Sequence, residues 1–118
     1  MSAAKPLPTP SDDAAWKALA DPTRRRILDE LRREPLPVGR LTSLFEMSRF
    51  GVMKHLRVLE EAGLVVVEAR GRERWNHLNP APIRAIYRRW IKPFEEDDAD
   101  RLLRFKQHVE ASPSEPEQ

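Results

Sequence analysis

Cationic and apolar side chains share one side of the segment between Ser48 and Leu64. Val52, Leu56 and Leu59 recur at helical spacing and are expected to face a core. The opposite side then carries five side chains: Arg49, Phe50, Met53, Lys54 and Arg57. Ser48 caps the helix and could also bond a phosphate. Arginine can make two hydrogen bonds to guanine, lysine can contact guanine or phosphate, and an apolar side chain can contact the thymine methyl group. These residue types at this spacing predict a helix that reads base edges in double-stranded DNA.

The simpler interpretation of Arg49, Lys54 and Arg57 is that they are solvated charges, as most charged residues on helices are. Phe50 and Met53 shift the balance, because an apolar pair exposed on a charged face indicates a binding partner. The sequence therefore favours DNA binding over a solvated face.

A second basic cluster follows at Arg70, Arg72 and Arg74. The segments 65–69 and 74–78 on either side predict a β-hairpin with these residues at its tip. Three guanidinium groups there would meet the minor groove or neighbouring phosphates. An ordinary soluble turn is the alternative, but the position directly after a candidate recognition helix favours a phosphate contact. The sequence leaves open which groove is touched.

Histidines and cysteines bear on metal and catalytic chemistry. The chain has no cysteine, which excludes disulfides, thiolate metal sites and thiol nucleophiles. His55, His77 and His108 show no metal-ligand spacing with carboxylates. His55 flanks the candidate DNA surface and is kept as a contact residue, although a packed role is commoner for such a histidine. With no nucleophile–base pair and no phosphate loop visible, we expect no enzymatic activity, metal or cofactor.

Length and charge distribution suit a small domain that faces a polyanion. The 118-residue chain has room for a single modest core. Residues 1–94 hold 18 Lys and Arg against 11 Asp and Glu, whereas residues 95–118 hold 3 against 8. This asymmetry is typical of a basic body that binds nucleic acid. No apolar run is long enough to cross a bilayer and the first residues lack a signal pattern, so we expect a cytoplasmic protein that has no membrane partner.

Three regions are expected along the chain. Residues 1–11, with prolines at positions 6, 8 and 10, and residues 112–118 should be flexible tails. Residues 12–111 should form one winged helix-turn-helix domain, mainly α with a small β-hairpin, in the order α-α-α-α-β-β-α-α. Its helices are expected at 12–20, 22–34, 38–45, from the Ser48 cap to Gly63, from Pro80 and Pro82 to Ile91, and at 97–109.

Local signals support these helices. Asp21 followed by Pro22 is a strong helix start, because the aspartate accepts from a free amide and proline has none to lose. The second helix should turn four arginines mostly outward: Arg24, Arg25, Arg32 and Arg33. The third should turn three apolar residues toward the core: Leu41, Leu44 and Phe45.

The terminal helices carry more apolar side chains than a domain of this size is expected to bury. We expect these residues to form a two-fold homodimer interface: Trp16, Leu19, Trp90, Ile91, Leu102 and Phe105. Such a dimer would place two recognition helices about 34–36 Å apart, which matches successive major grooves and a palindromic operator.

Three motifs in order carry a family resemblance: ALADPTRRRIL at 18–28, SRFGVMKHLRVLEEAGL at 48–64, and RGRER at 70–74. The chain resembles the arsenical-resistance repressor (ArsR/SmtB) family over roughly residues 12–109. The resemblance implies a winged-helix dimer with paired terminal helices, and places Ser48, Arg49, Phe50, Met53, Lys54 and His55 at or near DNA. Metal-sensing members carry a cysteine pair in the third helix or Asp and His ligands in the fifth. This chain has neither, so the resemblance is to the branch that does not sense metals.

We therefore expect a dimeric, sequence-specific transcriptional regulator. Repression rather than activation rests on the resemblance alone. The alternative is a winged-helix module that binds a protein or RNA through its basic face. The sequence does not identify the operator, the regulated genes or any small-molecule effector.

Overall fold

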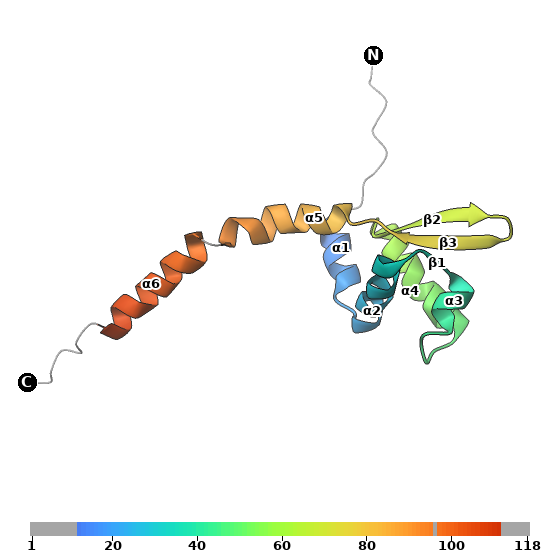
Figure 1. Ribbon diagram of the computed structural model, residues 1–118, viewed down its shortest axis with the longest axis horizontal. Coiled ribbons are helices and arrows are strands. Elements are labelled where there is room, and N and C mark those ends of the chain that lie inside the picture. The colour runs from blue at the N-terminus through green and yellow to red at the C-terminus, as the bar shows by residue number, and fades with distance from the viewer. Residues whose placement is uncertain (1–11, 96, 112–118) are drawn as a thin grey trace, which may run out of the picture. The chain divides into compact units, whose positions relative to one another are not determined.

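The computed structural model describes residues 12–95 and 97–111 (Figure 1). The predicted tails, 1–11 and 112–118, lie outside the described residues. The chain divides into two compact units, with the boundary between Arg84 and Ala85. The first unit holds the helix-turn-helix and the hairpin, and each unit is described below by itself.

Four helices build most of the first unit. They are α1 (Asp12–Leu19), α2 (Pro22–Arg33), α3 (Val38–Thr42) and α4 (Arg49–Glu61). The helices begin where the sequence predicts, but α3 ends three residues earlier than expected. The chain then turns through residues 43–47 before α4 begins.

Side-chain caps fix the starts of α2 and α4. Asp21 Oδ2 accepts a hydrogen bond from the Arg24 amide at 3.0 Å, with Pro22 at the first helical position. Ser48 Oγ accepts from the Gly51 amide at 3.0 Å. Each cap satisfies an amide that the helix itself leaves unpaired. The predicted caps are confirmed.

Glycine ends α4 as the sequence predicts. Gly63 has φ of +77°, in the left-handed region that favours glycine. Its amide donates to Glu60 O, and the Leu64 amide donates to Leu59 O, both at 2.9 Å. These bonds reverse the chain directly into the hairpin.

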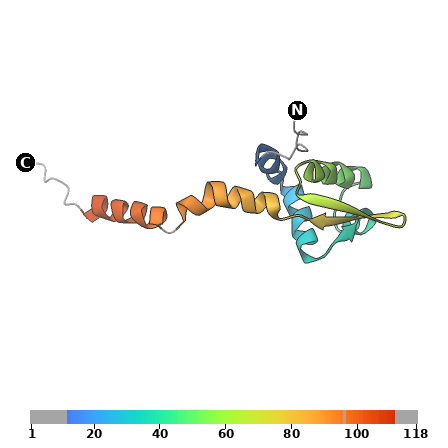
Figure 2. The same cartoon turned by 90° about the horizontal axis from the view of Figure 1, so that it is seen from above.

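The sheet has one more strand than the sequence predicts. The hairpin strands β2 (Val65–Arg70) and β3 (Glu73–Leu78) pair antiparallel, and the short β1 (Leu36–Pro37) pairs with the other edge of β3. Gly71, with φ of +61°, and Arg72 form the connecting turn. This hairpin projects beyond the helices of its unit (Figures 1 and 2).

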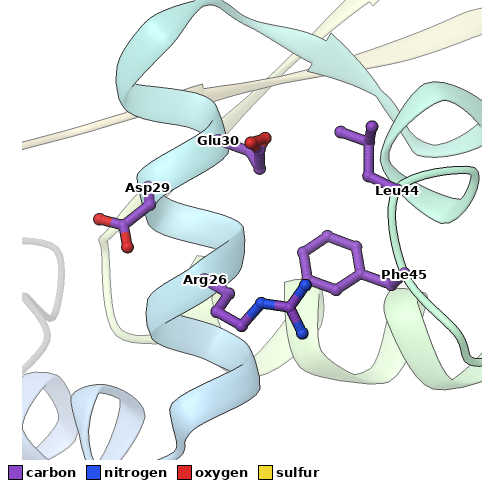
Figure 3. Close-up of a pocket in the computed structure, with 5 residues that line it drawn as sticks. All are labelled: Arg26, Asp29, Glu30, Leu44 and Phe45. Atoms are coloured by element: carbon purple, nitrogen blue, oxygen red, sulfur yellow. The ribbon is translucent and has the colours of Figure 1, made fainter.

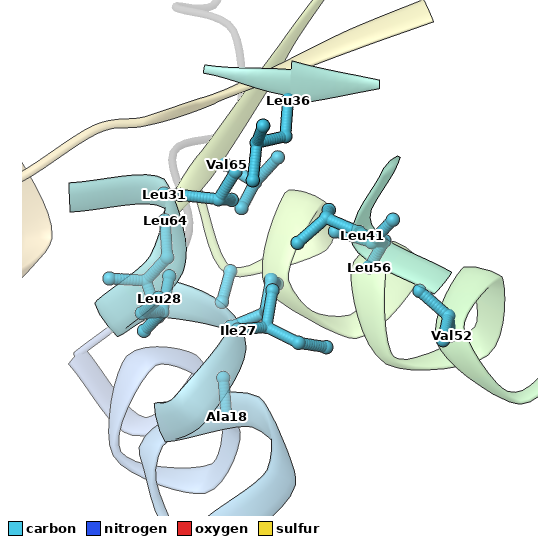
Figure 4. Close-up of a cluster of buried hydrophobic side chains, with 12 residues drawn as sticks. Ala18, Ile27, Leu28, Leu31, Leu36, Leu41, Val52, Leu56, Leu64 and Val65 are labelled. Carbon is cyan, nitrogen blue, oxygen red and sulfur yellow. The ribbon is translucent and has the colours of Figure 1, made fainter. Parts of the chain in front are cut away.

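The core of the first unit lies between α2, α4 and the base of the sheet. In Figure 4 the side chain of Leu31 lies beside Val65, and that of Ile27 extends from α2 toward α4. The buried cluster comprises Ala18, Ile27, Leu28, Leu31, Leu36, Leu41, Val52, Leu56, Leu59, Ala62, Leu64 and Val65. The inward assignment of Val52, Leu56 and Leu59 on α4 is confirmed.

Leu41 is buried and Phe45 packs against the core, as predicted. Leu44 was expected to face the core but is 48% exposed. The cause is the early end of α3, because residues after Thr42 no longer follow the helical spacing on which the expectation depended. Arg24 was expected to face outward but is partly buried and bonded to its own unit.

The second unit is helical. Helix α5 (Ala81–Ile86) starts before the unit boundary, and a π-helical turn (Tyr87–Ile91) and a 3₁₀ turn (Lys92–Phe94) continue it. Helix α6 spans Asp97–Ala111. The sequence predicts a continuous helix to Ile91; instead the Lys92 amide bonds to Tyr87 O, five residues back. In the part of the chain described, no helix combines the length and apolar character that crossing a membrane would require.

Candidate nucleic-acid interface

The outward face of α4 combines apolar and cationic side chains. Phe50 is 76% exposed and Met53 is 46% exposed. Arg49, Lys54 and Arg57 are also exposed. These side chains lie opposite the buried Val52, Leu56 and Leu59. The structure therefore places the predicted base-reading residues on one accessible helix face.

Strand alternation separates the arginines of the hairpin. Arg74 lies on the same face of β3 as the buried Asn76, because side chains two residues apart share a face. Arg70 lies on the other face, where its guanidinium bonds to Glu68 at 2.9 Å and covers the Trp75 ring at 4.4 Å. Arg72 is exposed in the turn. The sequence treats the three arginines as equivalent, but the structure gives them different surroundings.

A groove joins α4 to the hairpin. It has a volume of about 240 Å³ and lies among Pro37, Val38, Gly39, Arg49, Met53, Arg72, Glu73 and Arg74. A neighbouring groove of about 180 Å³ shares Val38, Met53 and Arg74 and adds Arg57. The fold thus brings the arginines of α4 together with Arg72 and Arg74. Glu73 is the one carboxylate among the residues that line the first groove.

Residues 37–39 are a part of this surface that sequence reasoning missed. Pro37 and Gly39 line the groove, and a β-carbon placed on Gly39 would lie 3.9 Å from Arg49 Nη1. Such a β-carbon would be in ordinary van der Waals contact with Arg49, so this position lies directly beside the Arg49 side chain. The proline followed closely by a glycine marks a break in the chain, but nothing in their types indicates a binding surface.

His55 occupies a different place from the other α4 candidates. Its side chain is 21% exposed, and its Nδ1 lies 3.3 Å from Arg24 Nη1 and 4.0 Å from Asp21 Oδ2. The imidazole is directed at the start of α2. This position favours the packed role that the sequence left open over direct DNA contact.

Two carboxylates near the candidate surface have a shifted pKa. The pKa of Asp21 lies below its ordinary value of 3.8, chiefly because the Arg24 amide donates to the carboxylate. The pKa of Glu68 is also lowered, first by the hydrogen bond with His77 Nε2 at 2.8 Å and then by Arg70. Both groups are therefore anionic at neutral pH. Glu68 neutralises Arg70 locally and leaves Arg72 and Arg74 as the more available cations of the hairpin.

A further cavity of about 280 Å³ lies between α2 and the segment after α3 (Figure 3). Arg26, Asp29 and Glu30 line one side, and Leu44 and Phe45 line the other. The Arg26 guanidinium lies 4.8 Å from the centroid of the Phe45 ring. None of these residues belongs to α4 or the hairpin, so the cavity is separate from the candidate interface.

The side chains that the structure describes do not suggest a metal site. Among residues whose side chains are described, no three His, Asp or Glu residues are grouped so that they would hold a metal ion. His77 and Glu68 form a pair on the hairpin, and His55 and Asp21 form another.

Comparisons with known proteins agree with the fold. A helix-turn-helix domain model matches residues 19–68. The HTH-type transcriptional regulator Rv2034 of Mycobacterium tuberculosis is 43% identical over 76 residues, covering 64% of this chain and 71% of that protein. The transcriptional repressor SdpR of Bacillus subtilis is 33% identical over 64 residues, covering 54% and 71%. The structure of an ArsR-like transcriptional regulator from Rhodococcus sp. RHA1 has a TM-score of 0.63 and 30% identity, covering 86% and 94%.

A helix-turn-helix followed by a basic hairpin defines a winged-helix DNA-binding protein. The second helix of this helix-turn-helix is α4, which exposes Arg49, Phe50 and Met53. With the similarities above, the chain belongs to the ArsR/SmtB family of winged helix-turn-helix transcriptional regulators.

Proposed function

We propose that this regulator is a homodimeric repressor that occupies a palindromic operator, with α4 in the major groove and the hairpin tip on flanking phosphates. The groove shared by Arg49, Met53, Arg72 and Arg74 carries the proposal. One surface then supplies arginine for guanine and an apolar contact for thymine, together with cations for phosphate.

Dimerisation is supported by apolar side chains left uncovered in the single chain. In the first unit Trp16 is 44% exposed and Leu19 is partly buried. In the second unit, Trp90, Ile91, Leu102 and Phe105 are 45–68% exposed. Large apolar surfaces of this kind in a soluble domain mark interaction sites. We propose that residues 12–111 act as a winged-helix domain whose terminal helices pair with those of a second copy.

We infer that the protein represses transcription, because a protein bound to a promoter blocks the access of other proteins to that DNA. The similar protein SdpR is named a transcriptional repressor. We propose a cytoplasmic location and no enzymatic activity, as suits a protein that acts by occupying DNA.

The test is selection of bound duplexes from a random DNA pool by the purified full chain, with sedimentation of the complex that forms. We expect enriched duplexes with two inverted half-sites about 10 base pairs apart, centre to centre, bound by two copies. The control offers an RNA pool of the same length. Preferential retention of RNA, or duplex binding with no enriched sequence, would contradict the proposal.

A further inference from the structure

Arg24 links three elements of the first unit. Its Nε donates to Ala18 O at 2.8 Å and its Nη2 donates to Lys17 O at 3.1 Å, so it caps the last turn of α1. Its amide donates to Asp21 at the start of α2. Its Nη1 lies 3.3 Å from His55 Nδ1 on α4. One side chain therefore ties the end of α1 to the middle of the recognition helix.

The contact between Arg24 and His55 depends on the tautomer of the imidazole. A guanidinium only donates hydrogen bonds, so the contact is a hydrogen bond when Nδ1 accepts and the proton lies on Nε2. A protonated imidazole has no free acceptor and would repel Arg24. It would be drawn instead to Asp21 Oδ2, which lies 4.0 Å from Nδ1. Among the described residues, Arg24 on α2 and Asp21 at the N-cap of α2 are the charged side chains with a contact to His55.

We propose that Arg24 is a positioning residue that sets the orientation of α4 relative to α1 through His55, and that protonation of His55 releases this link and weakens DNA binding. The inference rests on the proposed function, because α1 carries Trp16 and Leu19 of the proposed dimer face. In a dimer anchored through α1, the angle between α1 and α4 decides whether two recognition helices reach successive major grooves together.

Arg25 provides a matched control on the same helix. Its Nη1 donates to Leu19 O at 2.8 Å, so it also caps α1. This bond of Arg25 reaches α1, whereas the Arg24 guanidinium also reaches His55 on α4. Replacing Arg25 therefore removes a comparable cap and leaves the contact with His55 in place.

The first measurement is operator affinity by fluorescence anisotropy for the wild type, Arg24→Gln, Arg25→Gln and His55→Asn. Asparagine keeps an acceptor oxygen near the place of Nδ1 but does not titrate. At pH 7.5 we expect Arg24→Gln to weaken binding roughly threefold to tenfold, as loss of a hydrogen-bonded link implies. Arg25→Gln and His55→Asn should change it less than about twofold, below the typical effect of such a bond.

The pH profile separates positioning from direct contact. Histidine side chains in general change charge between pH 8 and 5. His77 and His108 are present in every variant, so the comparison with His55→Asn isolates the effect of His55. We therefore expect wild-type affinity to fall relative to His55→Asn as the pH is lowered from 8 to 5.5. If the ratio of wild-type affinity to His55→Asn affinity rises in acid, His55 contacts phosphate. If this ratio is constant, protonation of His55 does not affect DNA binding. Either result overturns the proposal.

The second measurement needs no DNA. Because the chain has no cysteine, Lys17→Cys and Glu61→Cys introduce spin labels only on α1 and α4. Pulsed electron resonance, with labelled protein diluted in unlabelled protein, reports the distance between them within one chain. We expect Arg24→Gln and mild acid to shift or broaden this distance, and Arg25→Gln to leave it unchanged. An unchanged distance in Arg24→Gln overturns the link, whereas failure of the wild type to bind any duplex overturns the proposed function instead.

Discussion

Arg70 places its guanidinium 4.4 Å from the centroid of the Trp75 ring, on the face of the hairpin opposite to Arg74. Glu68 holds the same guanidinium at 2.9 Å. Arg74 instead lines the groove that Arg49 and Met53 share. Two arginines only four positions apart therefore belong to different surfaces.

This separation predicts unequal effects of Arg70→Ala and Arg74→Ala. Arg74→Ala should weaken DNA binding and lower the slope of log affinity against log salt by about 1, as loss of one phosphate contact does. Arg70→Ala should leave that slope unchanged, because Arg70 is engaged by Glu68 and Trp75. Affinity measured over several salt concentrations tests this, and equal slopes in the two variants would refute the assignment.

Substitutions at Arg49, Lys54 and Arg72 probe the docking of α4 and the turn. Arg49→Ala and Lys54→Ala should each weaken operator binding, by about 1–3 kcal/mol where a base contact is lost. Arg72→Ala should act mainly through phosphate and reduce the salt slope. Arg33→Ala, which removes an exposed cation of α2 paired at 3.9 Å with Glu30, is the control. Wild-type affinity in all three variants would rule out this mode of docking.

Asp21→Ala should destabilise the fold in a pH-dependent way. Loss of the cap on α2 should cost about 1 kcal/mol in the free energy of unfolding at pH 7. The pKa of Asp21 is lowered in the folded protein, so its carboxylate stabilises the fold above its ordinary value of 3.8. That contribution disappears as the pH falls through the lower folded value. Urea unfolding at pH 7 and pH 3 should therefore show a difference from wild type that shrinks in acid; a constant difference would contradict this role.

Leu102→Gln combined with Phe105→Gln should dissociate the proposed dimer. Both side chains are more than 60% exposed in α6. Removing their apolar burial from both copies should raise the dissociation constant by at least about 100-fold. Sedimentation at several concentrations measures this, with Arg104→Gln on the same helix as control. A wild-type chain that sediments as a monomer, or a double variant that stays dimeric, would exclude this interface.

The elements with local signals were the ones that the sequence predicted well. The repeat of Val52, Leu56 and Leu59 lies within α4, and Ser48 and Gly63 lie just outside its two ends, so its limits and inward face follow from nearby residues. The same holds for Asp21 and Pro22 at the start of α2.

Features that depend on distant partners were missed. Strand β1 has two residues and exists because it pairs with Trp75 and Asn76, about 40 positions away, where Asn76 Nδ2 also donates to Leu36 O at 3.1 Å. The inward turn of Arg24 depends on α1 carbonyls and on His55. The π-helical turn after Ile86 leaves the apolar spacing nearly unchanged, so periodicity does not reveal it.

The most direct test of the account is guanine N7 methylation protection on the selected operator, because N7 lies in the major groove where α4 is proposed to bind. We predict two clusters of protected guanines about one helical turn apart. When Arg49→Ala is added at a concentration that saturates the operator, protection should be lost at specific guanines. Unprotected N7 atoms in a fully bound operator, or a pattern identical in Arg49→Ala, would contradict the placement of α4.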